Sequence, residues 1–228
     1  MPATRSEELP MKILAVDFSS PRRSVALVEE GGEGAVVVAG RMEEISGRRT
    51  LGLVEEALKQ AGWQREEIQT LAVGLGPGSY TGIRGAVALA QGWQLGRGVN
   101  LLGISTVECL AAQAEVEKMF GPVHIVIDAQ RNEFYLAGYE IAPDGRSETE
   151  ALRLAGFAEV QRLADGGARI IGPEATQWFA QAATVFPDAA ILGRLACGRR
   201  DYVAGCNLEP IYMRETTFKK APPLRVVT

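Results

Sequence analysis

One short pattern occurs twice in this chain, and it limits the possible folds more than any other feature. An apolar run rich in strand-forming residues ends in aspartate, and a second such run follows after a polar turn. The two copies are KILAVDF followed by SVALVEE and HIVIDAQ followed by FYLAGYEI, with Asp17 and Asp128 at equivalent places. Each copy predicts a β-hairpin, so the repeat predicts two similar lobes.

Strand and helix patterns alternate after the hairpins. The spacing of apolar residues predicts strands at 34–43, 68–76, 99–106 and 168–173, and helices at 49–61, 81–98, 156–165, 176–186 and 191–202. This alternation predicts an α/β fold of two similar lobes, with the second lobe reduced. We expect residues 1–10 to form a flexible extension, residues 11–108 the first lobe and residues 109–228 the second.

The composition excludes several classes of protein. With 228 residues, of which 46% are hydrophobic and 23% charged, the chain is typical of a globular protein. Its net charge of −4 disfavours nucleic-acid binding by the chain itself, because phosphate binding needs clustered Lys and Arg. Cys109, Cys197 and Cys206 lack the spacing of a disulfide framework or zinc site, which favours a reducing compartment. We find no apolar leader or membrane-length apolar run and expect a cytoplasmic protein without membrane contact.

The segment GLGPGSYTGIR, residues 74–84, joins a predicted buried strand to a predicted helix. It does not match the G-x-x-x-x-G-K-[ST] phosphate loop, nor the G-x-G-x-x-G dinucleotide fingerprint, because Thr81 stands where the third glycine belongs. Two interpretations stay open. The glycines can expose backbone N–H groups to an anion, or they can form a tight turn in which Ser79 or Thr81 caps the helix.

The paired aspartates also allow two interpretations. Asp17 precedes the small hydroxyl residues Ser19 and Ser20, a pattern that can hold hydrated magnesium while hairpin amides contact phosphate. The second hairpin, DAQRNEFY, has no glycine and carries long side chains where a ligand must approach the backbone. A nucleotide site formed by Asp17, Ser19, Ser20 and Asp128 is therefore predicted to be vestigial. The alternative is that each aspartate only caps its own hairpin.

The helix after the glycine loop carries a stripe of small or apolar residues at three- and four-residue steps. Its members are Gly85, Ala88, Leu89, Gly92 and Gly96. The neighbouring predicted helix has an apolar face formed by Leu51, Val54 and Leu58. Interior glycines cost roughly 1 kcal/mol each relative to alanine, so close packing must offset them. The stripe therefore predicts either tight packing inside the lobe or an interface with another subunit.

Five segments occur in a characteristic order. They are ILAVDFSSPRRSVALVE, GLGPGSYTGIRGAVALAQG, GISTVECLA, IDAQRNEFYLAGY and EPIYMR. In this order they resemble the TsaB family, the dimerisation subunit of the bacterial tRNA threonylcarbamoyladenosine machinery. The resemblance spans residue 11 to about residue 220, and the glycine loop is its most specific part. It implies the two-lobed fold shared by actin, hexokinase and the heat-shock ATPase.

The resemblance also implies a non-catalytic role. TsaB-like proteins pair with a larger, related catalytic subunit, TsaD, which transfers threonylcarbamoyl from its adenylate to the adenosine beside the anticodon, and a small ATPase, TsaE, joins the pair. We therefore expect a TsaD-like partner, a TsaE-like ATPase, tRNA binding only through the complex, and a homodimer when the chain is alone. The apolar faces of the two helices are the expected partner interface.

Other features concern chemistry. TsaD carries a His-x-x-x-His metal motif, whereas the one histidine of this chain is His124, so we expect no metal site and no catalytic residue. No cofactor is expected to be required, and ATP or ADP binding is expected to be weak and within the complex. Arg49 stands where family members commonly carry histidine, which leaves the role of that position open.

Two other classes of function can be compared with the sequence. A small-molecule kinase of the same fold would use Asp17 and Asp128 around magnesium ATP, and this is the alternative. It is weakened by the glycine-free second hairpin and the short second lobe. A peptidase would need a nucleophile paired with histidine, and the sequence offers no such pair beyond the lone His124.

Overall fold

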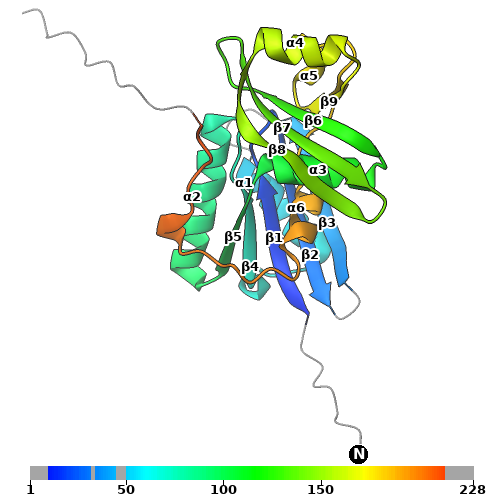
Figure 1. Ribbon diagram of the computed structural model, residues 1–228. Helices are drawn as coiled ribbons and strands as arrows, with labels where there is room; N and C mark the ends of the chain where they lie inside the picture. Colours follow the sequence, from blue (N-terminus) through cyan, green and yellow to red (C-terminus); the bar gives the residue numbers. More distant parts are fainter. Residues whose placement is uncertain (1–9, 32–33, 45–49, 214–228) are drawn as a thin grey trace, which may run out of the picture.

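The computed structural model describes residues 10–31, 34–44 and 50–213. It contains two five-stranded sheets, one below the other in Figure 1. The expected extension, apart from residue 10, lies outside the described residues, as does Arg49. Within the described residues, no helix is both long enough and apolar enough to cross a membrane.

The first sheet has the strand order β3-β2-β1-β4-β5. Its strands are β1 (Met11–Asp17), β2 (Arg22–Gly31), β3 (Gly34–Glu44), β4 (Thr70–Gly74) and β5 (Asn100–Ile104). Strands β1, β2 and β3 pair antiparallel, whereas β1, β4 and β5 pair parallel. The predicted first hairpin is confirmed, with Asp17 opposite Ser24 at its closed end.

The second sheet repeats this topology, with the order β10-β9-β6-β7-β8. Its strands are β6 (Gly121–Asp128), β7 (Glu133–Ala142), β8 (Gly145–Gly156), β9 (Arg169–Gly172) and β10 (Ala183–Thr184). Again the first three strands pair antiparallel, and β6, β9 and β10 pair parallel. The repeat confirms the α/β fold of two similar lobes, and the short strands β9 and β10 make the second lobe the smaller one.

The helices cover both faces of each sheet. They are α1 (Thr50–Ala61), α2 (Tyr80–Arg97), α3 (Thr106–Val116), α4 (Phe157–Asp165), α5 (Ala175–Trp178) and α6 (Ala189–Ala196), with short 3₁₀ turns η1 (Arg65–Glu67) and η2 (Gly205–Asn207). Helices α1 and α2 pack on the outer face of the first sheet, and α4 and α5 pack on the outer face of the second. Helices α3 and α6 contact each other between the sheets.

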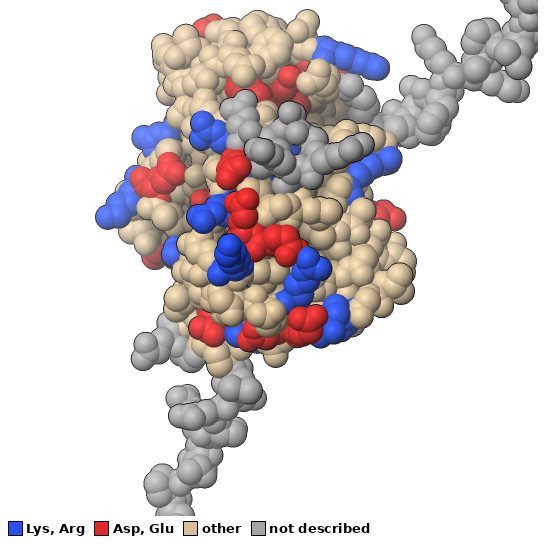
Figure 2. Space-filling view, turned by 180° about the vertical axis from the view of Figure 1, so that it is seen from behind, with Lys and Arg blue, Asp and Glu red and all other residues tan. Residues whose placement is uncertain are grey.

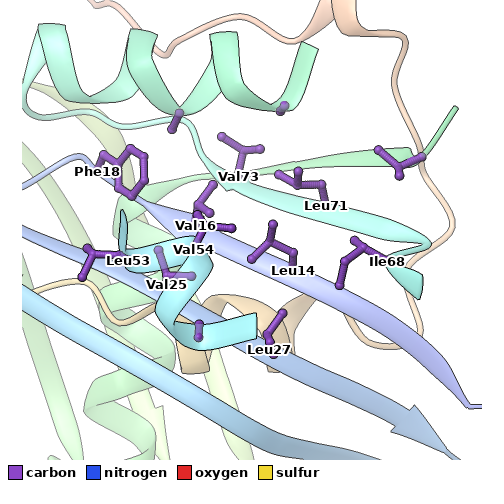
Figure 3. Close-up of a cluster of buried hydrophobic side chains, with 14 of the residues drawn as sticks. Leu14, Val16, Phe18, Val25, Leu27, Leu53, Val54, Ile68, Leu71 and Val73 are labelled. Carbon is purple, nitrogen blue, oxygen red and sulfur yellow. The ribbon is translucent and has the colours of Figure 1, made fainter. Parts of the chain in front are cut away.

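The packing of helices on both faces of the first sheet explains why its strands appear in the sequence as apolar runs. Alternate residues of β1 serve the two faces: Leu14 points toward α1 and α2, and Ala15 points toward α6. Figure 3 shows Leu14, Leu27 and Leu53 among the side chains that meet on the α1 side. Helices cover both faces of this sheet, so its central strands β1 and β4 are buried on both sides and show no polar alternation.

The chain crosses between the lobes twice. Helix α3 follows the first sheet in sequence but packs on the second sheet, whereas α6 follows the second sheet but packs on the first. Residues 203–211 then run back along the first lobe, where Val203 N donates to Leu101 O and Ile211 N donates to Leu75 O. A division at residues 108 and 109 therefore does not describe the packing, because residues 189–211 contact the first sheet and its helices.

One predicted helix, 176–186, is wrong. Helix α5 ends at Trp178, and Phe179 is extended with φ −129° and ψ 113°. The extended backbone places the Phe179 ring, which is 1% exposed, against Phe134 with ring centroids 5.3 Å apart. Ala183 and Thr184 form β10 beside β9, so an aromatic contact and a strand pair replace the expected helical turns.

Candidate functional site

The glycine loop lies directly against the first hairpin. A Cβ atom at Gly74 would overlap the Asp17 carboxylate, and a Cβ at Gly78 would overlap the Ser19 carbonyl oxygen. Gly78 also has φ +149°, a conformation that side-chain-bearing residues rarely adopt. These glycines therefore allow the loop to approach the hairpin closely.

The same loop starts helix α2. Ser79 is the N-cap, and its Oγ accepts a hydrogen bond of 3.4 Å from Gly82 N. Its backbone N–H does not point to solvent, because it donates to Ser19 O at 2.7 Å. Of the two interpretations of the loop, tight turning and capping match this geometry.

Asp17 lies inside the protein and not on an open surface. It is 0% exposed, and its Oδ1 accepts hydrogen bonds from Ser19 N at 2.8 Å and Ser19 Oγ at 2.6 Å. Its Oδ2 has no hydrogen-bond partner among the described residues. Burial raises the pKa of Asp17 to about 6, although the bonds from Ser19 and the nearby Arg23 lower it. Ser20 is equally buried, at 1% exposure.

A cleft of about 420 Å³ lies between the two lobes. Ser19 and Tyr80 line it from the first lobe, and Asp128 and Glu174 line it from the second. Burial raises the pKa of Glu174, and the charge of Asp128 raises it further. Among the described residues that line the cleft there is no lysine or arginine. Two carboxylates, with no lysine or arginine among the described lining residues, make this cleft unfavourable for a phosphate group.

The second hairpin uses its aspartate locally. Asp128 Oδ1 accepts from Gln130 N at 2.7 Å, and Asp128 Oδ2 accepts from Gln130 Nε2 at 3.0 Å. Gln130, Arg131 and Asn132 all have φ near +60°, which is uncommon for residues other than glycine. The structure thus brings Ser19 and Asp128 of the predicted site to the cleft, but leaves Asp17 and Ser20 beneath the surface.

A larger groove, of about 910 Å³, lies on the outside of the first lobe between α1 and α2. Leu51 stands on its edge and is 60% exposed, whereas Val54, at 2% exposed, forms part of its floor. Gly85 and Gly92 line it from α2, and a Cβ atom at either position would meet nothing within 4 Å. The groove is therefore open, apolar, and free of side chains along part of one wall.

Charged residues surround this groove. Arg65 pairs with Glu55, and Arg97 lies 3.9 Å from Glu66. All four of these residues line the groove, so charged pairs accompany its apolar residues. An apolar centre with a polar rim is typical of protein–protein interfaces.

The predicted interface residues divide into two groups. Those that line the groove are Leu51, Val54, Gly85, Ala88, Leu89 and Gly92. Leu58 does not: it is 4% exposed and packs in the core beneath α1. Gly96 does not line the groove either, although Trp93 and Arg97 on both sides of it in sequence do. Sequence reasoning missed Trp93, which lines the groove one helical turn after Leu89 and could have been found by extending the stripe by four residues.

The described residues contain no group of three or more His, Cys, Asp or Glu side chains placed to hold a metal ion. Two lobes with repeated hairpins around a cleft define an α/β protein of the two-lobed actin-like fold class, with an apolar groove between its outer helices.

Known proteins identify the family. The family model described as TsaD, tRNA N6-adenosine threonylcarbamoyltransferase, matches residues 21–192. The chain is 30% identical to the tRNA threonylcarbamoyladenosine biosynthesis protein TsaB of Escherichia coli strain K12, over 93% of this chain and 99% of that protein. The structure of YeaZ from Pseudomonas aeruginosa aligns with a TM-score of 0.73 at 26% identity, covering 89% of this chain and 99% of that one. The chain belongs to the TsaB family of tRNA threonylcarbamoyladenosine biosynthesis proteins.

Proposed function

We propose that this chain is the non-catalytic subunit that docks a TsaD-type catalytic subunit through the groove between α1 and α2. The observation that carries the proposal is the open apolar groove itself, with Leu51 60% exposed on one wall and Gly85 and Gly92 on the other. Full burial of a leucine side chain contributes roughly 1.5–3 kcal/mol. Burial of the exposed Leu51 side chain by a partner would therefore favour association.

A helix pair from a related chain suits this groove. The match to the TsaD model over residues 21–192 supports a common fold for the two subunits, so a TsaD-type partner would offer a corresponding helix pair. Small residues on α2 allow backbones to approach closely, and four helices then pack around a shared apolar seam. When the chain is alone, the same surface is proposed to pair with a second copy as a two-fold homodimer.

The interior of the cleft supports a non-catalytic role. Asp17 is buried and held by Ser19, and the exposed wall carries Asp128 and Glu174. A kinase of this fold needs metal-binding carboxylates that face the nucleotide together with groups that stabilise phosphate charge. The cleft offers this chemistry poorly, so the kinase remains the less favoured function. Any ATP or ADP that binds here is proposed to bind weakly and within the complex.

The proposal for the other partners is based on membership of the TsaB family. A TsaE-type ATPase and tRNA are expected to engage the assembled pair and not the isolated chain. Figure 2 shows Lys and Arg interspersed with Asp and Glu on one face of the molecule. A surface of mixed sign gives little of the counterion release that drives tight phosphate-backbone binding.

The docking surface is tested by a charge placed at its centre. Ala88→Arg puts a cation in the groove, and burial of that unpaired charge should cost several kcal/mol of association free energy. Leu95→Arg is the matched control, because Leu95 lies on the same helix, is 92% exposed and does not line the groove. Circular dichroism checks folding, light scattering measures self-association, and pull-down with the TsaD-type subunit of the same organism measures docking. A folded Ala88→Arg variant that binds as well as the control would place the interface elsewhere.

A further inference from the structure

Helix α2 has a weak sequence for a helix that must present a docking surface. Gly82, Gly85, Gly92 and Gly96 all lie within its bounds, Tyr80–Arg97. Glycine lowers helix stability relative to alanine, because it loses the most backbone freedom on folding. One side of α2 packs in the core through Ile83, Ala86, Val87 and Ala90, and the groove side is open, so contacts on its remaining sides add to the support of the helix.

Two glutamines near the C-terminal end of α2 hold a single residue of the returning chain. Gly205 N donates to Gln94 Oε1 at 2.7 Å, and Gln91 Nε2 donates to Gly205 O at 2.8 Å. Both polar groups of the Gly205 backbone are therefore bonded to this helix. Gln94 Nε2 also donates to Val99 O at 3.3 Å, which links the helix to the residue that precedes β5.

An aromatic and cationic cluster makes the second contact, in the first turns of α2. The rings of Tyr80 and Tyr212 lie 5.4 Å apart. Arg84 Nε donates to Tyr212 Oη at 3.2 Å, and its guanidinium lies 4.0 Å from the centre of the Tyr80 ring. The same returning segment thus touches α2 at both of its ends.

The returning segment, residues 203–212, is itself held to the first lobe. Val203 N donates to Leu101 O at 3.0 Å, and Ile211 N donates to Leu75 O at 2.8 Å. Leu208, between them, is 3% exposed and packs in the core of the first lobe. Figure 1 shows this segment, coloured orange, running beside α2.

We propose that residues 203–212 form a clamp that holds α2 in the shape its docking groove requires, with Gln91 and Gln94 as positioning residues. This inference rests on the proposed function, because the clamp can affect docking only if the groove binds a partner. Gln91 and Gln94 do not belong to the groove side: the stripe of Gly85, Ala88 and Gly92 lines the groove, and neither glutamine does. Their effect on docking must therefore pass through the position of the helix.

The test measures the stability of helix α2 and the binding of the partner separately. The double variant Gln91→Met/Gln94→Met keeps side-chain length and helix propensity but removes the bonds to Gly205. Tyr212→Ala removes the contact at the other end and serves as the second variant if the first does not fold. Gln161→Met is the control, because Gln161 lies on α4, away from α2, and its side chain donates to Asp165 of the same helix. Hydrogen exchange of amides 85–96 is measured on each full-length chain, and association with the TsaD-type subunit is measured in parallel.

We expect the amides of 85–96 to exchange about tenfold faster in the clamp variants, with association about five- to thirtyfold weaker, and the control to stay within about twofold of wild type. Unchanged exchange in folded variants overturns the clamp. Faster exchange with unchanged association overturns its role in positioning the docking surface. If Ala88→Arg binds normally, the proposed function fails instead, and the clamp is then rejected as a docking device whatever the exchange rates show.

Discussion

Asp17 and Ser19 form a closed pair at the end of β1, in which one carboxylate oxygen accepts both the backbone N–H and the hydroxyl of Ser19, at 2.8 Å and 2.6 Å. The pair leaves the second oxygen of Asp17 without a partner among the described residues, in a position that is 0% exposed. Ionisation of a buried carboxylate in this position lowers the free energy of unfolding of the protein. The effect of Asp17 on stability can therefore be measured as a function of pH.

The first prediction concerns pH. The pKa of Asp17 is raised to about 6 from an ordinary value of 3.8, so between these values the folded state binds more protons than the unfolded state. Asp17 then stabilises the fold below pH 4, and this contribution is lost as the pH rises through 6. The free energy of unfolding of Asp17→Asn, relative to wild type, should rise by about 2–3 kcal/mol between pH 4 and pH 7. Urea unfolding at several pH values measures this, and a constant difference would contradict the assigned burial.

The second prediction separates helix stability from docking. Gly85→Ala and Gly92→Ala should each stabilise the isolated chain by up to about 1 kcal/mol, because alanine is the better helix former and open space surrounds both positions. They should also weaken association, because the added methyl groups stand in the groove. Gly96→Ala is the control: it lies in the same helix in open space but does not line the groove. Equal association for all three variants would argue against close helix approach.

The third prediction is the absence of turnover in the isolated chain. With magnesium ATP, the purified protein should release no ADP above background, because Asp17 is buried and the cleft carries two carboxylates without a cation among its described lining residues. Working kinases run at roughly 1–100 per second, so turnover above about 0.1 per second is easily detected. Activity at that level that disappears in Asp17→Ala would favour the kinase.

The fourth prediction concerns tRNA. The isolated chain should bind tRNA near the non-specific range, with Kd about 10⁻⁴–10⁻⁶ M at physiological salt, because its net charge is −4 and its basic side chains are scattered. Filter binding across a salt series provides the measurement. Nanomolar binding by this subunit alone would require a basic surface and would assign it a direct part in tRNA recognition.

The duplicated hairpins could be predicted because their signal is local. Asp17 and Asp128 close apolar runs of the same kind, and both runs became strands of matching sheets. Strand β8 was missed for the opposite reason. Its sequence, GRSETEALRLAG, carries charged and polar residues at the edge of the second sheet, and an exposed edge strand shows no apolar run.

The interface residues show where sequence reasoning stops. Leu51, Val54 and Leu58 occupy one stripe at helical spacing, but α1 lies between the sheet and the groove, so one stripe serves both surfaces. Leu51 is 60% exposed and Leu58 is 4% exposed. Spacing identifies the apolar side of a helix; which part of it stays uncovered depends on the elements that pack against it. The clamp contacts between Gln91, Gln94 and Gly205 are beyond local patterns, since they join residues far apart in sequence.

Helix α3 packs on the second sheet and α6 packs on the first, and this arrangement affects the order in which the lobes can fold during synthesis. When the first five strands have left the ribosome, one face of their sheet still lacks its cover, because Ile191, Leu192 and Ala196 of α6 are synthesised later. The second lobe must emerge before the first can close. The nascent protein therefore cannot complete its lobes one after the other, and premature termination anywhere before α6 would leave an apolar sheet exposed to aggregation and proteolysis.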